Sequence, residues 1–180
     1  GGRDRIVLAS KVAGPSDRSW LRADGKPALL DAKNINEAID NSLRRLNTDY
    51  LDLYQLHWPN RPLALFGNAA HAPTRGGEDA PEVPIEETLE ALEGLVKAGK
   101  VRHIGLSNET AWGLSRFLHL AELRGLPRVA SVQNAYNLLN RTYEEALAEF
   151  HAREDVGLLA YSPLAQGFLT GKYRNGARPA

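Results

Sequence analysis

The segment Leu51–Pro59, with the sequence LDLYQLHWP, contains the clearest strand signal in this chain of 180 residues. Its first six residues, Leu51–Leu56, are mostly apolar or aromatic, and the run is too short for a typical helix. Such a run is typical of a strand buried on both faces of a parallel sheet. His57 and Trp58 follow where the strand would reach the surface. We therefore predict a strand that carries an imidazole to one end of a sheet.

Four other short apolar runs have the same character, and a segment with helical periodicity separates each strand from the next. The alternation β-α-β-α-β-α-β-α-β implies a parallel sheet with helical crossovers. The other predicted strands are Arg5–Ser10 (RIVLAS), Val101–Gly105 (VRHIG), Val129–Gln133 (VASVQ) and Val156–Tyr161 (VGLLAY). The apolar stripes of the predicted helices run over 35–46, 85–96, 114–121 and 143–150.

Capping residues mark the ends of these predicted helices. Asn34 and Glu37 have the spacing of a capping box for the first helix. Pro84 and Gly99 are suited to begin and end the second. For the third helix the candidate N-caps are Ser107 and Asn108, residues that are also placed to bind a ligand.

A parallel sheet of this kind belongs either to a doubly wound fold or to a (β/α)₈ barrel. A doubly wound dinucleotide-binding domain would normally carry G-x-G-x-x-G after a strand, and the sequence has no such motif. Five β-α units cannot close a barrel of eight strands. We predict a single domain over residues 1–180, and if it belongs to a barrel, three strands lie outside the sequence.

The links between these elements differ in length, and the long ones follow strands. Lys11–Lys33 follows the first strand and Trp58–Pro84 the second, whereas every link from helix to strand is short. Long loops after the carboxyl ends of parallel strands are typical of a working face. We expect the loop over 59–84 to cover this face, although a disordered insertion at Leu63–Glu82 remains an alternative.

The composition excludes several classes of protein. The sequence has 22 basic and 22 acidic residues, so its net charge is zero and it lacks the excess of positive charge typical of proteins that bind nucleic acid or an anionic membrane. No apolar run approaches the ~20 residues that a membrane helix needs. The absence of cysteine excludes disulfides and thiolate catalysis. We expect a cytoplasmic protein, and because the chain also lacks methionine, we expect it not to begin at a translation start.

Each predicted strand ends in residues that carry chemistry. Lys11 and His57 end neighbouring strands and can converge on one pocket, since adjacent strands lie ~4.8 Å apart. The amides of later strand ends suit a carboxamide ligand, because an amide donates and accepts hydrogen bonds. Glycines after the fifth strand let backbone N–H groups approach a phosphate. The later strand-end candidates are Ser107, Asn108, Gln133, Asn134, Tyr161, Ser162, Gly167 and Gly171.

Together these motifs resemble one known family. The strings LASK, DLYQLHWP, IGLSN, VQNAYNLL and LLAYSPLAQGFLTGKY, in this order and spacing, are similar to the aldo-keto reductases. Within that family the sequence resembles the branch of the Tas-like proteins and the potassium-channel β-subunits. The resemblance extends over essentially the whole chain. It implies a (β/α)₈ barrel that binds NADPH at its mouth and transfers hydride to the carbonyl of an aldehyde or ketone.

The resemblance also implies a role for individual residues. Lys11 matches the lysine of the catalytic tetrad, and His57 matches the histidine that orients the substrate carbonyl. Trp58 matches a position that lines the substrate pocket. The residues that match cofactor-binding positions are Ser107, Asn108 and Gln133 at the nicotinamide carboxamide, Tyr161 against the nicotinamide ring, and Ser162, Leu164, Gln166, Gly167 and Leu169 around the pyrophosphate.

Two parts of the family pattern are absent from this sequence. The tetrad aspartate and tyrosine would precede Gly1, and the stretch that binds the 2′-phosphate would follow the eighth strand. We therefore expect the 180-residue chain to be incomplete at both ends and inactive by itself. The substrate, the preference for NADPH over NADH and the oligomeric state cannot be deduced from these residues.

Two other functions remain open, and a third is disfavoured. A nucleotide-sensing regulatory subunit would keep the cofactor site but turn over slowly. Another barrel enzyme could use Lys11 as a Schiff-base amine, although the GLSN and YSPLA strings argue against it. A metal enzyme is disfavoured because the histidines lack ligand spacing with acidic partners. These histidines are His57, His71, His103, His119 and His151.

Overall fold

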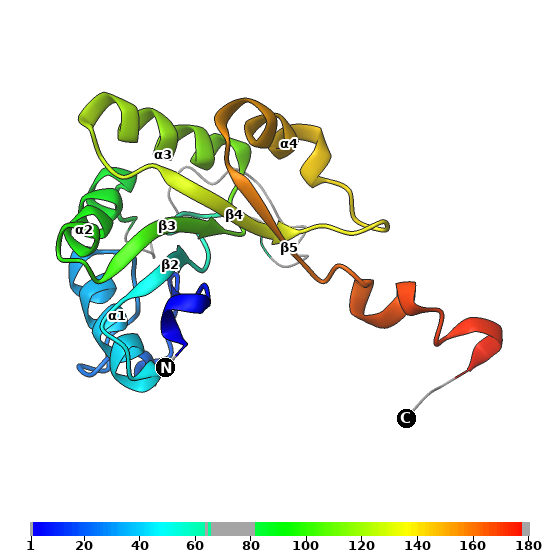
Figure 1. Cartoon of the computed structure of the whole chain (residues 1–180), viewed down its shortest axis with the longest axis horizontal. Helices are drawn as coiled ribbons and strands as arrows, with labels where there is room; N and C mark the ends of the chain where they lie inside the picture. The colour runs from blue at the N-terminus through cyan, green and yellow to red at the C-terminus, as the bar shows by residue number, and fades with distance from the viewer. Residues whose placement is uncertain (1, 64, 66–81, 178–180) are drawn as a thin grey trace.

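The computed structural model describes residues 2–63, 65 and 82–177 of the chain. Within them, a sheet of 5 parallel strands is arranged in sequence order (Figure 1). Each strand therefore lies beside the one that precedes it in the chain. The strands are β1 (Ala9–Val12), β2 (Leu51–Leu56), β3 (Val101–Ser107), β4 (Val129–Ala135) and β5 (Gly157–Tyr161).

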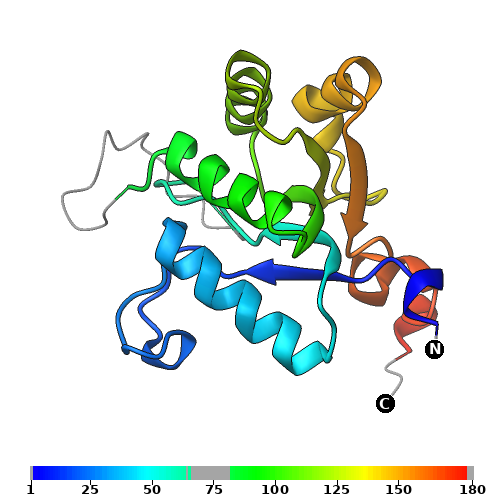
Figure 2. The same ribbon diagram turned by 60° about the vertical axis from the view of Figure 1, so that its left-hand side comes forward.

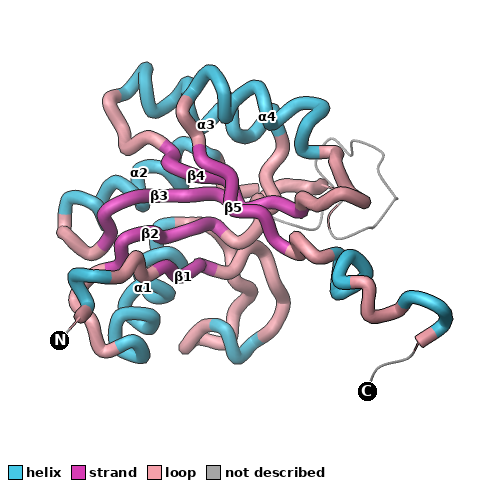
Figure 3. The backbone as a smooth tube through the Cα atoms, turned by 45° about the vertical axis from the view of Figure 1, so that its right-hand side comes forward, coloured by secondary structure: helices cyan, strands magenta, loops and turns pink. Residues whose placement is uncertain are grey.

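In the described part of the chain, four α-helices connect the strands and lie on one face of the sheet (Figures 1 and 3). Helix α1 lies beside α2 at this face (Figure 2). The main core lies between the helices and the sheet. It contains fully buried apolar side chains of the helices, such as Ile39 and Leu92, and of the strands, such as Tyr54. The helices are α1 (Ala32–Leu46), α2 (Ile85–Lys97), α3 (Ala111–Arg124) and α4 (Tyr143–Glu154).

The first strand is shorter and later than the sequence predicts. Arg3–Arg5 forms a 3₁₀ turn rather than the start of a strand, and Ile6 and Val7 are 55% and 80% exposed. Pairing with β2 begins only at Ala9, opposite Leu53. The predicted strand Arg5–Ser10 is therefore wrong at its N-terminal end, because a β-branched run becomes a strand only where a neighbour supplies hydrogen bonds.

The remaining strands agree more closely with the sequence prediction. β2 has the predicted bounds. β3 and β4 each extend two residues past the predicted ends. β3 reaches Ser107, which pairs with Gln133, and β4 reaches Ala135, which pairs with Tyr161 of β5. The added residues include Ser107 and Asn134, two of the strand-end candidates, which therefore lie at the end of the sheet.

Two of the predicted N-caps are wrong. Helix α1 is capped by Asp31, whose side chain accepts a hydrogen bond from the Asn34 backbone N–H at 2.7 Å. Helix α3 is capped by Thr110, which accepts from the Gly113 N–H at 3.2 Å. Ser107 belongs to β3 instead. The predicted boundaries of α2 are confirmed, since Pro84 directly precedes it.

The loop from β1 to α1 is folded on itself and against the next loop. Ser16 and Ala28 form an antiparallel bridge within it. The Asn60 side chain accepts a hydrogen bond from the Leu30 N–H at 2.9 Å, which connects the two long loops. Most of the predicted 59–84 loop, at 64 and 66–81, lies outside the described residues. None of the described helices is both long and apolar enough for a membrane span.

Candidate active site

Lys11 and His57 lie on neighbouring strands at the carboxyl end of the sheet. Lys11 is opposite Gln55 in the register of β1 and β2. The backbone N–H of His57 donates to the carbonyl of Val12 at 3.0 Å, which extends the same pairing by one step. The structure thus brings the predicted ammonium and imidazole together, as expected for the ends of adjacent parallel strands.

The electrostatics of this pair favour an uncharged imidazole. The protein atoms around His57, and secondly the positive charge of Lys11, lower the pKa of the imidazole below its ordinary value. Partial burial likewise lowers the pKa of the Lys11 ammonium. Burial disfavours the charged form of both groups, and the neighbouring positive charge of Lys11 adds to the lowering of the pKa only for His57.

Trp58 packs against His57 and is fixed by the preceding loop. The two rings have centroids 4.7 Å apart at an angle of 48°. The indole N–H of Trp58 donates to the carbonyl of Pro15 at 3.2 Å. A Cβ at Gly14 would overlap the indole, so only glycine leaves room for it there. The loop after β1 therefore sets the position of the predicted pocket tryptophan.

Asn108 is the centre of a hydrogen-bond network that joins residues at or near the ends of β2, β3, β4 and β5. Its side-chain amide donates to the carbonyl of His57 at 2.9 Å and to the hydroxyl of Ser107 at 3.2 Å. Its carbonyl oxygen accepts from the hydroxyl of Tyr161 at 2.7 Å. Its backbone N–H donates to the carbonyl of Gln133 at 3.0 Å. Four predicted site residues are therefore held by this one side chain and its backbone.

The backbone of Asn108 has a φ of 55°, in the left-handed region. Asparagine tolerates this conformation better than most residues. Asn108 therefore turns the chain directly after β3, between the strand and Glu109. An asparagine here serves the turn and the hydrogen-bond network together, which is a second reason for this residue besides ligand binding.

A polar row lies in the sheet at the level of Lys11. Gln55, Gly105 and Ser131 are successive partners in the register after Lys11. A Cβ at Gly105 would lie 3.0 Å from the Ser131 hydroxyl and 3.1 Å from Cγ of Gln55. Within the described chain, Gln55 Nε2 and Ser131 Oγ are buried without a hydrogen-bond partner. Sequence reasoning missed Gln55, although its place two residues before His57 puts both on one face of β2.

The predicted phosphate segment follows β5 and leads away from the sheet (Figure 1). The Ser162 carbonyl accepts from the Asn137 side chain at 3.0 Å. The Leu164 carbonyl accepts from the N–H groups of Gly167 and Leu169 at 2.9 and 3.2 Å. Gln166 and Gly167 have φ of 53° and 96°. The segment has the tight turns expected of an anion-binding loop.

Lys172 is a further residue of this segment that sequence reasoning missed. A Cβ at Gly167 would lie 2.9 Å from the Lys172 Nζ, so the ammonium lies beside the turn. The sequence could have indicated Lys172 as a phosphate-binding candidate, because it follows the predicted phosphate-loop residue Gly167 by five positions. The structure thus brings Lys11, His57 and Trp58 to the same end of the sheet as Asn108 and its partners. The segment after β5 that contains residues 164–169 runs away from the sheet (Figure 1). Among the described residues, no group of 3 or more His, Cys, Asp or Glu side chains is placed to hold a metal ion.

A parallel sheet with helices on one face, and with lysine, histidine and amide side chains at the carboxyl ends of its strands, is the architecture of a barrel-type α/β protein. The sequence model of the Aldo/keto reductase family matches residues 1–180. The chain therefore belongs to the aldo/keto reductase family, and its fold is part of a (β/α)₈ barrel.

Individual relatives agree with this assignment. The chain is 52% identical over 182 residues to Protein tas of Escherichia coli (strain K12), covering 100% of this chain and 51% of that protein. It is 46% identical over 177 residues to an aldo-keto reductase of Babesia bovis, covering 94% of this chain and 61% of that protein. The chain thus spans about half to three fifths of the length of these relatives.

A solved structure resembles the chain in three dimensions. It is the crystal structure of the thermostable aldo-keto reductase Tm1743 in complex with the inhibitor epalrestat, with a TM-score of 0.66 and 32% sequence identity. The match covers 92% of this chain and 47% of that chain. The sheet and helices described above therefore correspond to about half of such a barrel.

Proposed function

We propose that this chain is part of an NADPH-dependent oxidoreductase that reduces the carbonyl group of an aldehyde or ketone. The observation that supports it best is the placement of Lys11 and His57 on adjacent strand ends, beside the amides of Asn108 and Gln133. A cation and a neutral imidazole at one opening suit a carbonyl oxygen that gains negative charge.

The side chains present fit a nicotinamide cofactor. The Gln133 side-chain amide makes no hydrogen bond to other described residues, so it can donate to and accept from a carboxamide. Ser107 and Asn108 add a hydroxyl and a second amide at the same end of β3. The turn at Gly167, with Lys172 beside it, fits a pyrophosphate. When bound, the cofactor would supply the hydride.

The residues of this chain would then act on the substrate oxygen. His57, whose lowered pKa favours the neutral form, would donate a hydrogen bond from one ring N–H to the carbonyl. Lys11 would provide positive charge and lower the pKa of the tetrad tyrosine, the expected proton donor. Trp58 would form one wall of the substrate pocket. The Tyr161 ring would stack on the nicotinamide and select the face that reacts.

The test uses the full-length protein that contains this chain. We expect NADPH to bind with quenching of tryptophan fluorescence, and to be oxidised in the presence of an aromatic aldehyde such as 4-nitrobenzaldehyde. NADH should be used less well. Lys11→Met should keep NADPH binding but lower kcat by ~10²–10⁴-fold, the range for loss of a group that supports proton transfer. Failure of the protein to bind NADPH would contradict the proposal.

Two other outcomes are informative. Tight NADPH binding without turnover of any aldehyde would favour the nucleotide-sensing function instead. Covalent capture of an aldehyde on Lys11 by borohydride would favour the Schiff-base enzyme.

The isolated 180-residue chain should show no turnover, and aldehyde-dependent oxidation of NADPH by it would refute that expectation. The proposal also places the protein in the cytoplasm, which cell fractionation would test.

A further inference from the structure

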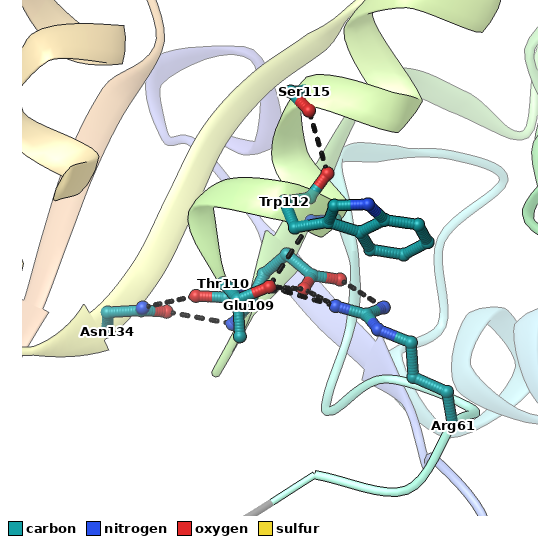
Figure 4. A network of polar contacts seen from close by, with 7 residues as sticks. Arg61, Glu109, Thr110, Trp112, Ser115 and Asn134 are labelled. Carbon is teal, nitrogen blue, oxygen red and sulfur yellow. Dashed lines mark hydrogen bonds and ion pairs between the residues drawn. The ribbon is translucent and has the colours of Figure 1, made fainter. Parts of the chain in front are cut away.

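An ion pair between Arg61 and Glu109 lies directly beside the candidate active site. Arg61 is four residues after His57, and Glu109 directly follows Asn108. The two nitrogen atoms Nη1 and Nη2 of Arg61 contact the two carboxylate oxygens of Glu109, and the Nη1–Oε2 distance is 3.1 Å (Figure 4). The exposed fractions of the two side chains are only 15% and 3%. The pair is therefore bidentate and largely removed from water.

The backbone of Glu109 is held on its other side by Asn134. The Asn134 side chain accepts from the Glu109 N–H at 3.2 Å and donates to the Glu109 carbonyl at 2.8 Å (Figure 4). Asn134 directly follows Gln133 in β4. An amide that satisfies both polar groups of one residue fixes that residue in position and orientation.

The start of helix α3 completes the arrangement. Arg61 Nη2 donates to the Thr110 hydroxyl at 3.1 Å, and the Arg61 guanidinium carbon lies 5.2 Å from the centroid of the Trp112 ring. The Thr110 N–H donates to the Glu109 carboxylate at 2.6 Å. A Cβ at Gly113 would overlap both members of the ion pair, so the helix approaches them closely.

These contacts link three segments that each carry a predicted site residue next to a member of the network. Arg61 belongs to the segment after His57, Glu109 to the segment after Asn108, and Asn134 to the segment after Gln133. A buried ion pair adds little net stability compared with apolar side chains of similar volume. Its directional, bidentate geometry instead restricts how the segments can move relative to one another.

We propose that Arg61 and Asn134, both acting through Glu109, are positioning residues that set the distances among His57, Asn108 and Gln133. Neither would touch the substrate or the cofactor. The network would hold the carbonyl-binding imidazole in register with the two nicotinamide-binding amides. This inference rests on the proposed function and adds to it the residues that hold the site residues in position.

The experiment compares Arg61→Met, the double variant Arg61→Met with Glu109→Gln, and Asn134→Ala in the full-length protein. The control is Arg124→Met, which breaks the exposed pair of Arg124 with Glu90 between α3 and α2. Arg61→Met leaves a buried carboxylate unpaired and should lower the Tm. The double variant removes both charges, and its glutamine can still accept from the Thr110 N–H, so most of the Tm should return.

A positioning role predicts that activity does not return with stability. The double variant and Asn134→Ala should both show kcat/KM lowered by about tenfold to 10²-fold, the effect of a small displacement of reacting groups. In the nucleotide-free protein, the side-chain amide NMR signals of Asn108 and Gln133 should shift in these variants. They should stay unchanged in Arg124→Met.

The outcomes separate the two proposals. Recovery of both Tm and kcat/KM in the double variant, or unshifted amide signals, would show that the network only stabilises the fold. If the double variant does not fold, Asn134→Ala decides, because its charges are intact. Absence of NADPH binding in the unmodified protein and in Arg124→Met would overturn the proposed function, and with it the positioning role.

Discussion

The hydroxyl of Tyr161, at the end of β5, donates a hydrogen bond to the side-chain oxygen of Asn108, just after β3, at 2.7 Å. The two residues are 53 positions apart in sequence. Their contact spans β4, the strand that lies between them in the sheet. The predicted stacking residue and the predicted carboxamide-binding residue are thus parts of one network.

This contact predicts different effects for two changes at Tyr161. Tyr161→Phe removes one partly buried hydrogen bond and should lower the free energy of unfolding by about 1 kcal/mol. Because the ring remains, affinity for NADPH should change little. Tyr161→Ala should also weaken NADPH binding by about 1–3 kcal/mol, the range for lost aromatic stacking. Urea unfolding and fluorescence titration measure the two effects. Equal NADPH affinities in the two variants would contradict a stacking role.

Lys11 should control the ionisation of His57. The charge of Lys11 is the second cause of the lowered imidazole pKa, after burial. Removing it in Lys11→Met should therefore raise the pKa of His57 toward the ordinary value near ~6.5. Titration of the His57 ring protons by NMR would measure the change. Lys33→Met, which alters an exposed lysine of α1, is the matched control, and an equal shift there would contradict a specific effect of Lys11.

Gly14 should be intolerant of even one added methyl group. Gly14→Ala places a Cβ against the Trp58 indole, and overpacking of this kind costs about 1–3 kcal/mol. Gly94→Ala, in the interior of α2, meets no atom within 4 Å and should be neutral or stabilising. Urea unfolding compares the two variants. The carbonyl substrate should also bind less well to Gly14→Ala, and an unchanged KM would argue against Trp58 as a pocket wall.

Asp52 should protect the fold in acid. Its pKa is lowered to about 2, first by the Leu8 N–H and then by Arg3 and Arg102. Because the folded pKa lies below the unfolded value near ~3.9, this stabilisation is present above pH ~4 and is lost as pH falls toward 2. Asp52→Asn should therefore reduce the dependence of stability on pH in that window. Unfolding curves between pH 5 and pH 2 would test this, and unaltered pH dependence would contradict it.

Local sequence patterns predicted the structure correctly where a residue's environment depends only on the strand or helix to which it belongs. The run Leu51–Leu56 is apolar on both faces, and it forms a strand with the predicted bounds. The long β-α loops and the parallel order place the strand-end residues at one end of the sheet, as predicted. In contrast, Ile6 and Val7 have high strand propensity but pair with no strand among the described residues, and they are exposed.

The errors and omissions are of two kinds: a wrong choice among neighbouring capping residues, and contacts between distant segments. Asn34 is a good capping residue, but Asp31 lies one turn earlier and reaches the free N–H first. Nothing in the sequence near Arg61 indicates that its partner is Glu109, 48 positions away. Gln55 reads as an ordinary strand residue, and only the register shows that it adjoins Lys11.

The order of residues along the chain determined the alternation of strands and helices, the parallel sheet and the chemistry at each strand end, because periodicity and length act locally. The tertiary structure alone decided where β1 begins and that Asn108 and Glu109 connect the ends of neighbouring strands. Such hydrogen bonds and ion pairs depend on distances between segments, and those distances exist only once the sheet has formed.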